Sequence, residues 1–263
     1  MKVPRHIVDA RRESIAQLIV ERGYLPVQDI SSRFGISEAT VRRDLVHLAS
    51  QRRLTRTRGG ALNEFNRRLA SVDERRSSEA VAKLAIGRSG AALVRPGMTI
   101  YIDAGSTPLA VAEVLLKLGI AKLTVVTPSL AAAEILVGLP DASVHVPGGL
   151  YLGRQRMVAG ASSAKALRAW SFDLAFVGSE GVNRRGLHNS QADIIAVTHT
   201  LLEVSERVVL CLTRSKIGAS GPVRVVPTLD GFTLLTNATA REVRAARLPL
   251  GGCRLVHVAT PER

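Results

Sequence analysis

Short apolar runs, each followed by a loop of small residues, constrain the fold of the C-terminal part of this 263-residue chain. The runs are Met98–Ile102, Leu123–Val126, Val144–Val146, Asp173–Val177 and Val208–Leu212. Helical patterns follow the first two runs, at residues 109–115 and 130–138. Apolar strands that alternate with helices are typical of largely parallel sheets. The pattern therefore predicts an α/β domain with a mostly parallel sheet.

The loops after these strands carry the candidate ligand-binding residues. Ligands of such sheets bind beyond the carboxyl ends of the strands, so we expect the loops to converge there. Thr107 is predicted to cap the next helix, with Pro108 as its first residue, which turns backbone N–H groups toward an anion. The residues predicted to bind a ligand are Asp103, Gly105, Ser106, Thr107, Ser129, Gly148, Gly149 and Lys216. Two plainer interpretations stay open: the 103–107 loop is an ordinary connection, and Lys216 is a solvated lysine.

Three helical segments are predicted in the N-terminal part of the chain, at residues 9–22, at about 27–34, and from Ser37 to about Gln51. Ser37 is a suitable N-cap, and Glu38 in the first turn suits the helix dipole. The second and third helices are separated by a tight turn that contains glycine. This arrangement is typical of a helix-turn-helix, whose second helix enters the major groove of DNA.

Residues 53–60 alternate arginines with apolar or β-branched residues and end in two glycines, which predicts a β-wing. Arginines on the helix and the wing suit guanine edges and phosphates. The predicted DNA contacts are Ser37, Thr40, Arg42, Arg43, His47, Arg56 and Arg58. The alternative is a small helical bundle with a solvated basic face.

The charge balance favours a polyanionic partner. The chain holds 36 basic and 22 acidic residues, for a net charge of +14, and its first 60 residues hold a net +6. We expect a DNA-binding domain at 1–63, a polar linker at 64–80 and an α/β domain at 81–263. Two cysteines far apart exclude a disulfide framework. No long apolar run and no signal-peptide pattern is present, which predicts a cytoplasmic protein with no membrane partner.

The segment Gly-Ile-Ser-Glu-Ala-Thr-Val-Arg-Arg-Asp-Leu (35–45), with Leu-Thr-Arg-Thr-Arg-Gly-Gly-Ala (54–61), resembles the winged helix of the DeoR family of bacterial transcription regulators. Arg58 departs from the His usual in that family. The C-terminal part is similar to the family's sensor domain, itself like sugar-phosphate isomerases of the ribose-5-phosphate isomerase kind. The matching segments are 103–107, 148–149, 173–178 and 215–218. The resemblance implies a repressor that senses a phosphorylated sugar or related metabolite. A dimer or tetramer would place two winged helices on the half-sites of a repeated operator, so we also expect a homo-oligomer.

Several departures from the family pattern concern the candidate ligand site. Pro128 stands where many relatives have Asn, Thr213-Arg214 replaces a segment with Asp, and 192–198 lacks a Glu-rich, Lys-containing helix start. An isomerase needs a positioned carboxylate base and an acid, and these losses argue against a complete catalytic set. We therefore expect a ligand-controlled transcription regulator, not an enzyme, with no metal and no cofactor. The alternatives are a sugar-phosphate isomerase with an accessory basic domain and an architectural DNA binder that senses nothing.

Overall fold

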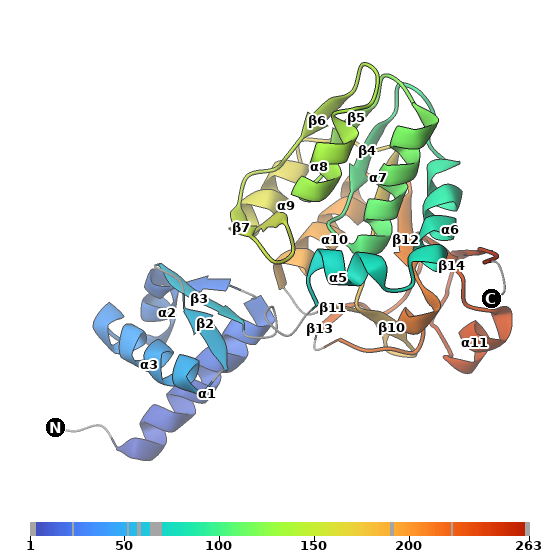
Figure 1. The fold of residues 1–263 in the computed structure, drawn as a ribbon. Helices are drawn as coiled ribbons and strands as arrows, with labels where there is room; N and C mark the ends of the chain where they lie inside the picture. The colour runs from blue at the N-terminus through green and yellow to red at the C-terminus, as the bar shows by residue number, and fades with distance from the viewer. Residues whose placement is uncertain are drawn as a thin grey trace. The chain divides into compact units, whose positions relative to one another are not determined.

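The computed structural model describes residues 4–22, 24–51, 53–56, 59–63, 70–189, 192–221 and 223–260. The chain separates into two compact units, a smaller one formed mainly by Met1–Leu69 and a larger one formed by Ala70–Asn189 and Asp193–Arg263. Figure 1 shows the elements of each unit. Among the described residues, no helix combines the length and hydropathy that a membrane span requires.

The smaller unit packs three helices against a three-stranded sheet. Its elements are α1 (Arg5–Arg22), β1 (Tyr24–Pro26), α2 (Val27–Phe34), α3 (Glu38–Ser50), β2 (Leu54–Arg56) and β3 (Gly60–Asn63). The sheet is antiparallel in the order β1-β3-β2. Helix α1 begins four residues earlier than predicted, and β1 is an addition that the sequence pattern did not indicate. The three predicted helices and the wing strand are confirmed.

Local chemistry explains where α2 ends and α3 begins. Gly35 has φ +61°, a left-handed conformation that suits glycine at a helix C-terminus. The Ser37 hydroxyl accepts a hydrogen bond from the Thr40 backbone N–H, as an N-cap should. Val41, Leu45 and Leu48 are buried against α1 and the sheet, in one core cluster with Ile15 and other apolar residues of the unit. The exposed face of α3 is thereby fixed.

The larger unit is built on a seven-stranded sheet in the order β15-β14-β12-β9-β4-β5-β6, in which each pairing is parallel. The strands are β4 (Thr99–Ile102), β5 (Thr124–Val126), β6 (Ser143–His145), β9 (Leu174–Val177), β12 (Val208–Leu212), β14 (Phe232–Thr236) and β15 (Arg254–His257). The five predicted strands lie in this sheet, so the α/β fold class is confirmed.

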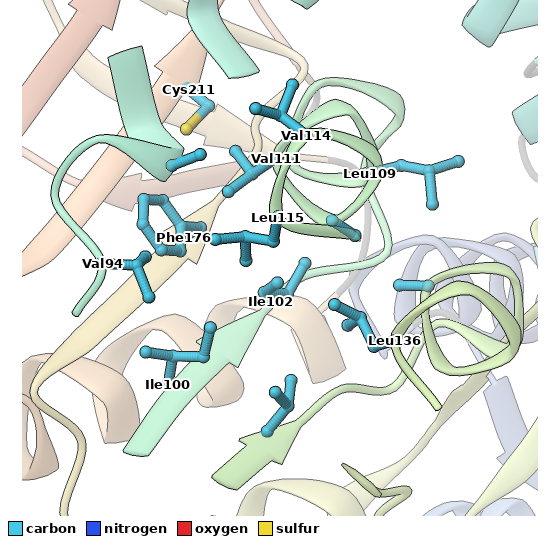
Figure 2. Packing of buried hydrophobic residues seen from close by; sticks show 14 of the residues in the cluster. Val94, Ile100, Ile102, Leu109, Val111, Val114, Leu115, Leu136, Phe176 and Cys211 are labelled. Atoms are coloured by element: carbon cyan, nitrogen blue, oxygen red, sulfur yellow. The ribbon is translucent and has the colours of Figure 1, made fainter. Parts of the chain in front are cut away.

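Helices cover both faces of the sheet (Figure 1). The helices of this unit are α5 (Val72–Ser77), α6 (Ala80–Ala91), α7 (Ser106–Leu118), α8 (Leu130–Leu136), α9 (Ala161–Leu167), α10 (Ala192–Val204) and α11 (Ala240–Ala245). Successive residues of β4 point to opposite faces, as the pleat requires: Ile100 and Ile102 pack with α6, α7 and α8, whereas Tyr101 packs with α9 and α10. Figure 2 shows the first of these cores.

Two small sheets complete the larger unit. An antiparallel sheet orders β10 (Gly181–Asn183), β11 (Gly186–Asn189) and β13 (Val223–Val226), and β7 (Leu150–Leu152) pairs with β8 (Met157–Ala159) as a hairpin. Because the strands of the main sheet are parallel, the loops after β4, β5, β6, β9 and β12 leave the same edge. The candidate ligand residues therefore lie along one edge of the sheet.

Candidate DNA-binding and ligand-binding sites

The exposed face of α3 carries the predicted DNA-contacting side chains. Ser37 and Thr40 lie in the first turn, with their hydroxyl oxygens 3.0 Å apart. Arg42 is exposed and pairs with Glu38 at 2.9 Å, one turn earlier. The Arg43 side chain is exposed and forms no hydrogen bond or ion pair with any described residue. Arg43 is therefore the cation on this face that needs no internal pair to be broken before it binds phosphate.

The remaining predicted contacts lie at the C-terminal end of α3 and in the wing. The His47 ring is within 3.1 Å of the Gln51 side-chain amide, and Arg56 on β2 is exposed. Arg58 lies outside the described residues. Arg53, which precedes β2 and is not one of the predicted DNA contacts, donates two 2.7 Å hydrogen bonds from its guanidinium to Glu13 of α1.

Asp44 is a structural residue that the sequence analysis missed. Its side chain is only 2% exposed, and its two oxygens accept hydrogen bonds from Arg11 Nε and Arg12 Nε, each at 2.8 Å. Two guanidiniums on α1 thus hold a carboxylate on α3. Helical spacing could have predicted the burial of Asp44, because it lies beside Leu45 at the edge of the stripe formed by Val41, Leu45 and Leu48.

Asp103 follows β4 at the centre of the candidate ligand site. Its Oδ2 accepts a hydrogen bond from the Gly178 backbone N–H at 3.0 Å, which joins the loops after β4 and β9. Burial raises the pKa of the Asp103 carboxyl, although backbone N–H groups of Gly178 and Ala104 and the charge of Arg75 act to lower it. A buried carboxyl at the carboxyl edge of a parallel sheet is a suitable acceptor for a ligand hydroxyl.

The N-terminus of α7 differs in detail from the prediction. Gly105, not Thr107, is the N-cap residue, and it makes no side-chain cap. Pro108 is accordingly the third helical residue, where its missing N–H is still not needed by the helix. Ser106 and Thr107 thus lie in the first turn and are buried at 8% and 9% exposure. A Cβ on Gly105 would lie 3.0 Å from the Pro108 ring, so glycine suits this close turn.

Ser129, Gly148 and Gly149 have structural partners inside the protein. The Ser129 hydroxyl caps α8 by accepting the Ala132 N–H at 3.1 Å. The Gly148 carbonyl accepts a hydrogen bond from the Ser163 hydroxyl at 2.7 Å. A Cβ on Gly149 would lie 2.6 Å from the Ala159 carbonyl oxygen, so only glycine fits there. These three residues therefore have structural roles inside the protein, as a helix cap, a hydrogen-bond acceptor and a close backbone approach.

Two basic residues follow β12, and only one of them has an ion-pair partner among the described residues. Lys216 is half-buried, and its ammonium has no hydrogen-bonding or ion-pairing partner among the described residues. Arg214, whose charge favours an anionic ligand only if it points inward, instead pairs with Glu242 of α11 at 3.2 Å. Lys216 is therefore the cation that this loop offers to a ligand.

Two further cations reach the same edge, Arg75 from the segment predicted to be a linker and Lys83 from the start of the predicted α/β domain. Lys83 on α6 is only 7% exposed, and its ammonium donates hydrogen bonds to the Arg75 and Ser78 carbonyls. Burial lowers the pKa of Lys83, and the charges of Lys216 and Arg75 lower it further, against the opposing effect of Glu79. Burial also lowers the pKa of Arg75, whose charge interacts with Asp103 and Glu180. The Arg75 Nε is buried and has no hydrogen-bond partner among the described atoms.

A sequence signal for this segment was available and was missed. Ser71 and Glu74 form a capping box, in which the Ser71 hydroxyl accepts the Glu74 N–H and the Glu74 carboxylate accepts the Ser71 N–H. A serine followed three residues later by glutamate is a recognised helix start. The signal therefore predicts α5, and with it an ordered segment before α6.

Two hollows adjoin the candidate site. A cleft of about 450 Å³ lies along α5, α6 and α7, and its lining includes Ser106, Lys83, Lys117 and Glu113. Glu113 pairs with Arg76 at 2.6 Å. A second cavity of only about 20 Å³ lies beside Asp103 and is lined mainly by apolar residues, Pro128 among them. The first has the size of a small-molecule site, whereas the second holds no more than about one water molecule.

Comparisons with known proteins agree with this arrangement. The model of the DeoR C-terminal sensor domain matches residues 78–238, and that of the DeoR-like helix-turn-helix domain matches residues 11–64. The chain is 29% identical over 230 residues to an uncharacterized transcriptional regulator, YgbI, of Escherichia coli strain K12, with 86% of this chain and 89% of that protein covered. It is 28% identical over 216 residues to the glycerol-3-phosphate regulon repressor of the same strain, with 82% and 85% covered. The repressor GlcR of Bacillus subtilis strain 168 is 26% identical over 249 residues, with 94% and 95% covered.

Among solved structures, ribose 5-phosphate isomerase A of Methanocaldococcus jannaschii matches at a TM-score of 0.37 and 18% identity, covering 53% of this chain and 55% of that chain. A likeness at this level carries no argument about function. The matched relatives are named transcriptional regulators and repressors, so the isomerase alternative finds no support among them. With a helix-turn-helix unit, a sensor unit and regulators as its relatives, the chain belongs to the DeoR family of DNA-binding transcriptional regulators.

Proposed function

We propose that this protein is a repressor whose operator affinity falls when an anionic metabolite, such as a phosphorylated sugar or polyol, binds the larger unit. The observation that carries the proposal is the set of poorly neutralised cations at the edge of the parallel sheet. Burial and the nearby charge of Lys216 lower the pKa of Lys83, and Arg75 keeps a buried Nε without a partner among the described atoms. Buried cations of this kind are costly unless an anion pairs with them.

The chemistry of the site suits a phosphate group with a hydroxylated body. The first turn of α7 offers backbone N–H groups with the positive end of the helix dipole, and Lys83 and Ser106 line the adjoining cleft. Asp103 accepts hydrogen bonds and so suits a hydroxyl donor. The similarity to the glycerol-3-phosphate regulon repressor of Escherichia coli supports a small phosphorylated effector. The apolar surroundings of Pro128 favour an effector that is short or has few hydroxyls on that side.

The DNA-binding half of the proposal rests on the exposed face of α3 and on the wing. Ser37, Thr40, Arg42, Arg43 and His47 lie on or beside α3, where the N-terminal half of a recognition helix contacts base edges and phosphates. Arg56 and Arg58 belong to the predicted wing. A homo-oligomer, dimer or tetramer, would place two such units on the half-sites of a repeated operator in the cytoplasm.

The test is operator binding with and without candidate effectors. DNA from upstream of the gene and its neighbours is titrated with the protein, alone and with a panel of sugar and polyol phosphates. We expect one compound to weaken specific binding. Arg43→Ala should weaken operator binding and leave effector binding unchanged. Lys216→Ala should weaken effector binding and leave operator binding unchanged. If each variant, well folded, impairs both activities equally, the proposed division of labour is wrong.

A further inference from the structure

Glu79 has an unusual backbone at the point where α5 leads into α6. Its φ is +52°, in the left-handed region that residues with a side chain rarely adopt. Such a strained conformation persists where contacts with the surrounding structure hold it in place, and residues of this kind are common at functional sites. The surroundings here are the loop after β12: Glu79 Oε2 accepts hydrogen bonds from Thr213 Oγ1 at 2.8 Å and from Ser215 Oγ at 2.7 Å.

A phosphate oxygen could take the place of Glu79 Oε2 between these two hydroxyls. A single oxygen of Glu79 takes both hydroxyl donors, and the two hydroxyl oxygens are 3.1 Å apart. Lys216 follows Ser215 directly in the chain, and Lys83 lies one helical turn after Glu79 and is attracted by its charge. Two hydroxyls beside two ammonium groups form the kind of donor set that binds phosphate.

We propose that Glu79 is a built-in competitor of the anionic effector: its carboxylate occupies the Thr213 and Ser215 hydroxyls in the ligand-free protein, and effector binding displaces it. The proposal rests on the proposed function and adds how that site is regulated. Displacement removes the contacts that hold Glu79 in the left-handed conformation. The junction between α5 and α6 then relaxes, on the stretch of chain that follows the DNA-binding unit in the sequence.

The experiment uses the full-length protein and inorganic phosphate as the probe, at constant ionic strength. Phosphate affinity is measured by calorimetry for the wild type, for Glu79→Gln and for the control Glu134→Gln. The control removes an exposed carboxylate of α8 that pairs with Arg156. Removing a competing charge is expected to tighten phosphate binding by about fivefold or more in Glu79→Gln. The control should bind like the wild type. Amide hydrogen exchange in α5 should accelerate on adding phosphate to the wild type and be fast without phosphate in Glu79→Gln.

Each other outcome overturns a defined part of the argument. Equal or weaker phosphate binding by Glu79→Gln, with wild-type binding that Lys216→Ala abolishes, refutes the competitor and leaves the anion site standing. Equal tightening in Glu134→Gln means that net charge alone is responsible, which also refutes the competitor. Absence of phosphate binding by both the wild type and Glu79→Gln overturns the anion site and the competitor together. If Glu79→Gln is unstable, Glu79→Gly, which suits the left-handed backbone, replaces it.

Discussion

The ion-pair cluster at Asp44 allows a prediction with a magnitude. Replacing Asp44 with Asn leaves the Arg11 and Arg12 guanidiniums, which are 16% and 22% exposed, without their shared negative partner. Breaking a buried ion pair costs about 3–5 kcal/mol, and the partial exposure of the arginines places the loss near the lower end. A domain of some sixty residues is stable by roughly 3–9 kcal/mol. The substitution should therefore remove about a third or more of the stability of the DNA-binding unit, so that this unit unfolds at a lower urea concentration and operator binding weakens.

The assay exploits the position of the single tryptophan. Trp170 packs near His145 and Phe172 in the larger unit, so its fluorescence reports that unit alone. In Asp44→Asn, far-UV circular dichroism should show an early loss of helix on adding urea, while the tryptophan transition stays at the wild-type midpoint. Asp9→Asn removes an exposed carboxylate 3.7 Å from Arg12 and is the matched control, with an expected change below about 0.5 kcal/mol.

The reasoning would be refuted if Asp44→Asn showed no early loss of helix, or if Asp9→Asn showed an early loss of equal size. A simultaneous shift of the tryptophan transition would also count against it, since the predicted loss is confined to the smaller unit. Replacing all three charged residues with apolar ones of similar size should recover part of the stability, because the cost arises from unpaired charge and not from the loss of the ions themselves.

Further predictions concern both units. Asp103→Asn should stabilise the larger unit at neutral pH and weaken the effector response. Because burial raises the pKa of Asp103 on folding, wild-type stability should fall as pH rises from about 4 through that raised value, a fall that thermal melts of Asp103→Asn should lack. Arg43→Ala should weaken operator binding about tenfold and reduce the salt slope of binding by about one, with Arg88→Ala in the larger unit as a silent control in gel-shift titrations. Cys211, whose thiol pKa burial raises, should resist alkylation until the unit unfolds, whereas half-buried Cys253 should react first when labelling is followed by mass spectrometry.

The fold was predictable from the sequence where local signals and burial agree. In α3, the Ser37 cap and the apolar spacing both indicate a helix, and the structure confirms its start. The strand β12 is a continuous apolar run buried on both faces, which is the pattern of a central parallel strand. The N-terminus of α7 was harder, because Gly105, Ser106 and Thr107 are all acceptable near a helix start, and only the tertiary setting selects Gly105 as the cap.

The ligand site was predictable in outline only. Topology places Asp103 and Lys216 at one edge of the sheet, since parallel strands end together. It does not reveal that Ser129 is occupied as a helix cap or that Arg214 pairs with Glu242. These contacts depend on how the chain packs in three dimensions, which no local sequence pattern reveals.

The segment from α5 to α6 shows why a polar stretch should not be equated with a linker. The segment lacks an apolar stripe because several of its charged side chains face the sheet edge. Arg75 and Lys83 contribute buried positive charge, and Glu79 accepts hydrogen bonds from the loop after β12. A ligand can control DNA affinity only if it has different affinities for the DNA-binding and released states. An anion that competes with Glu79 changes the contacts of this segment directly, so the energy difference arises in the part of the chain that must transmit it.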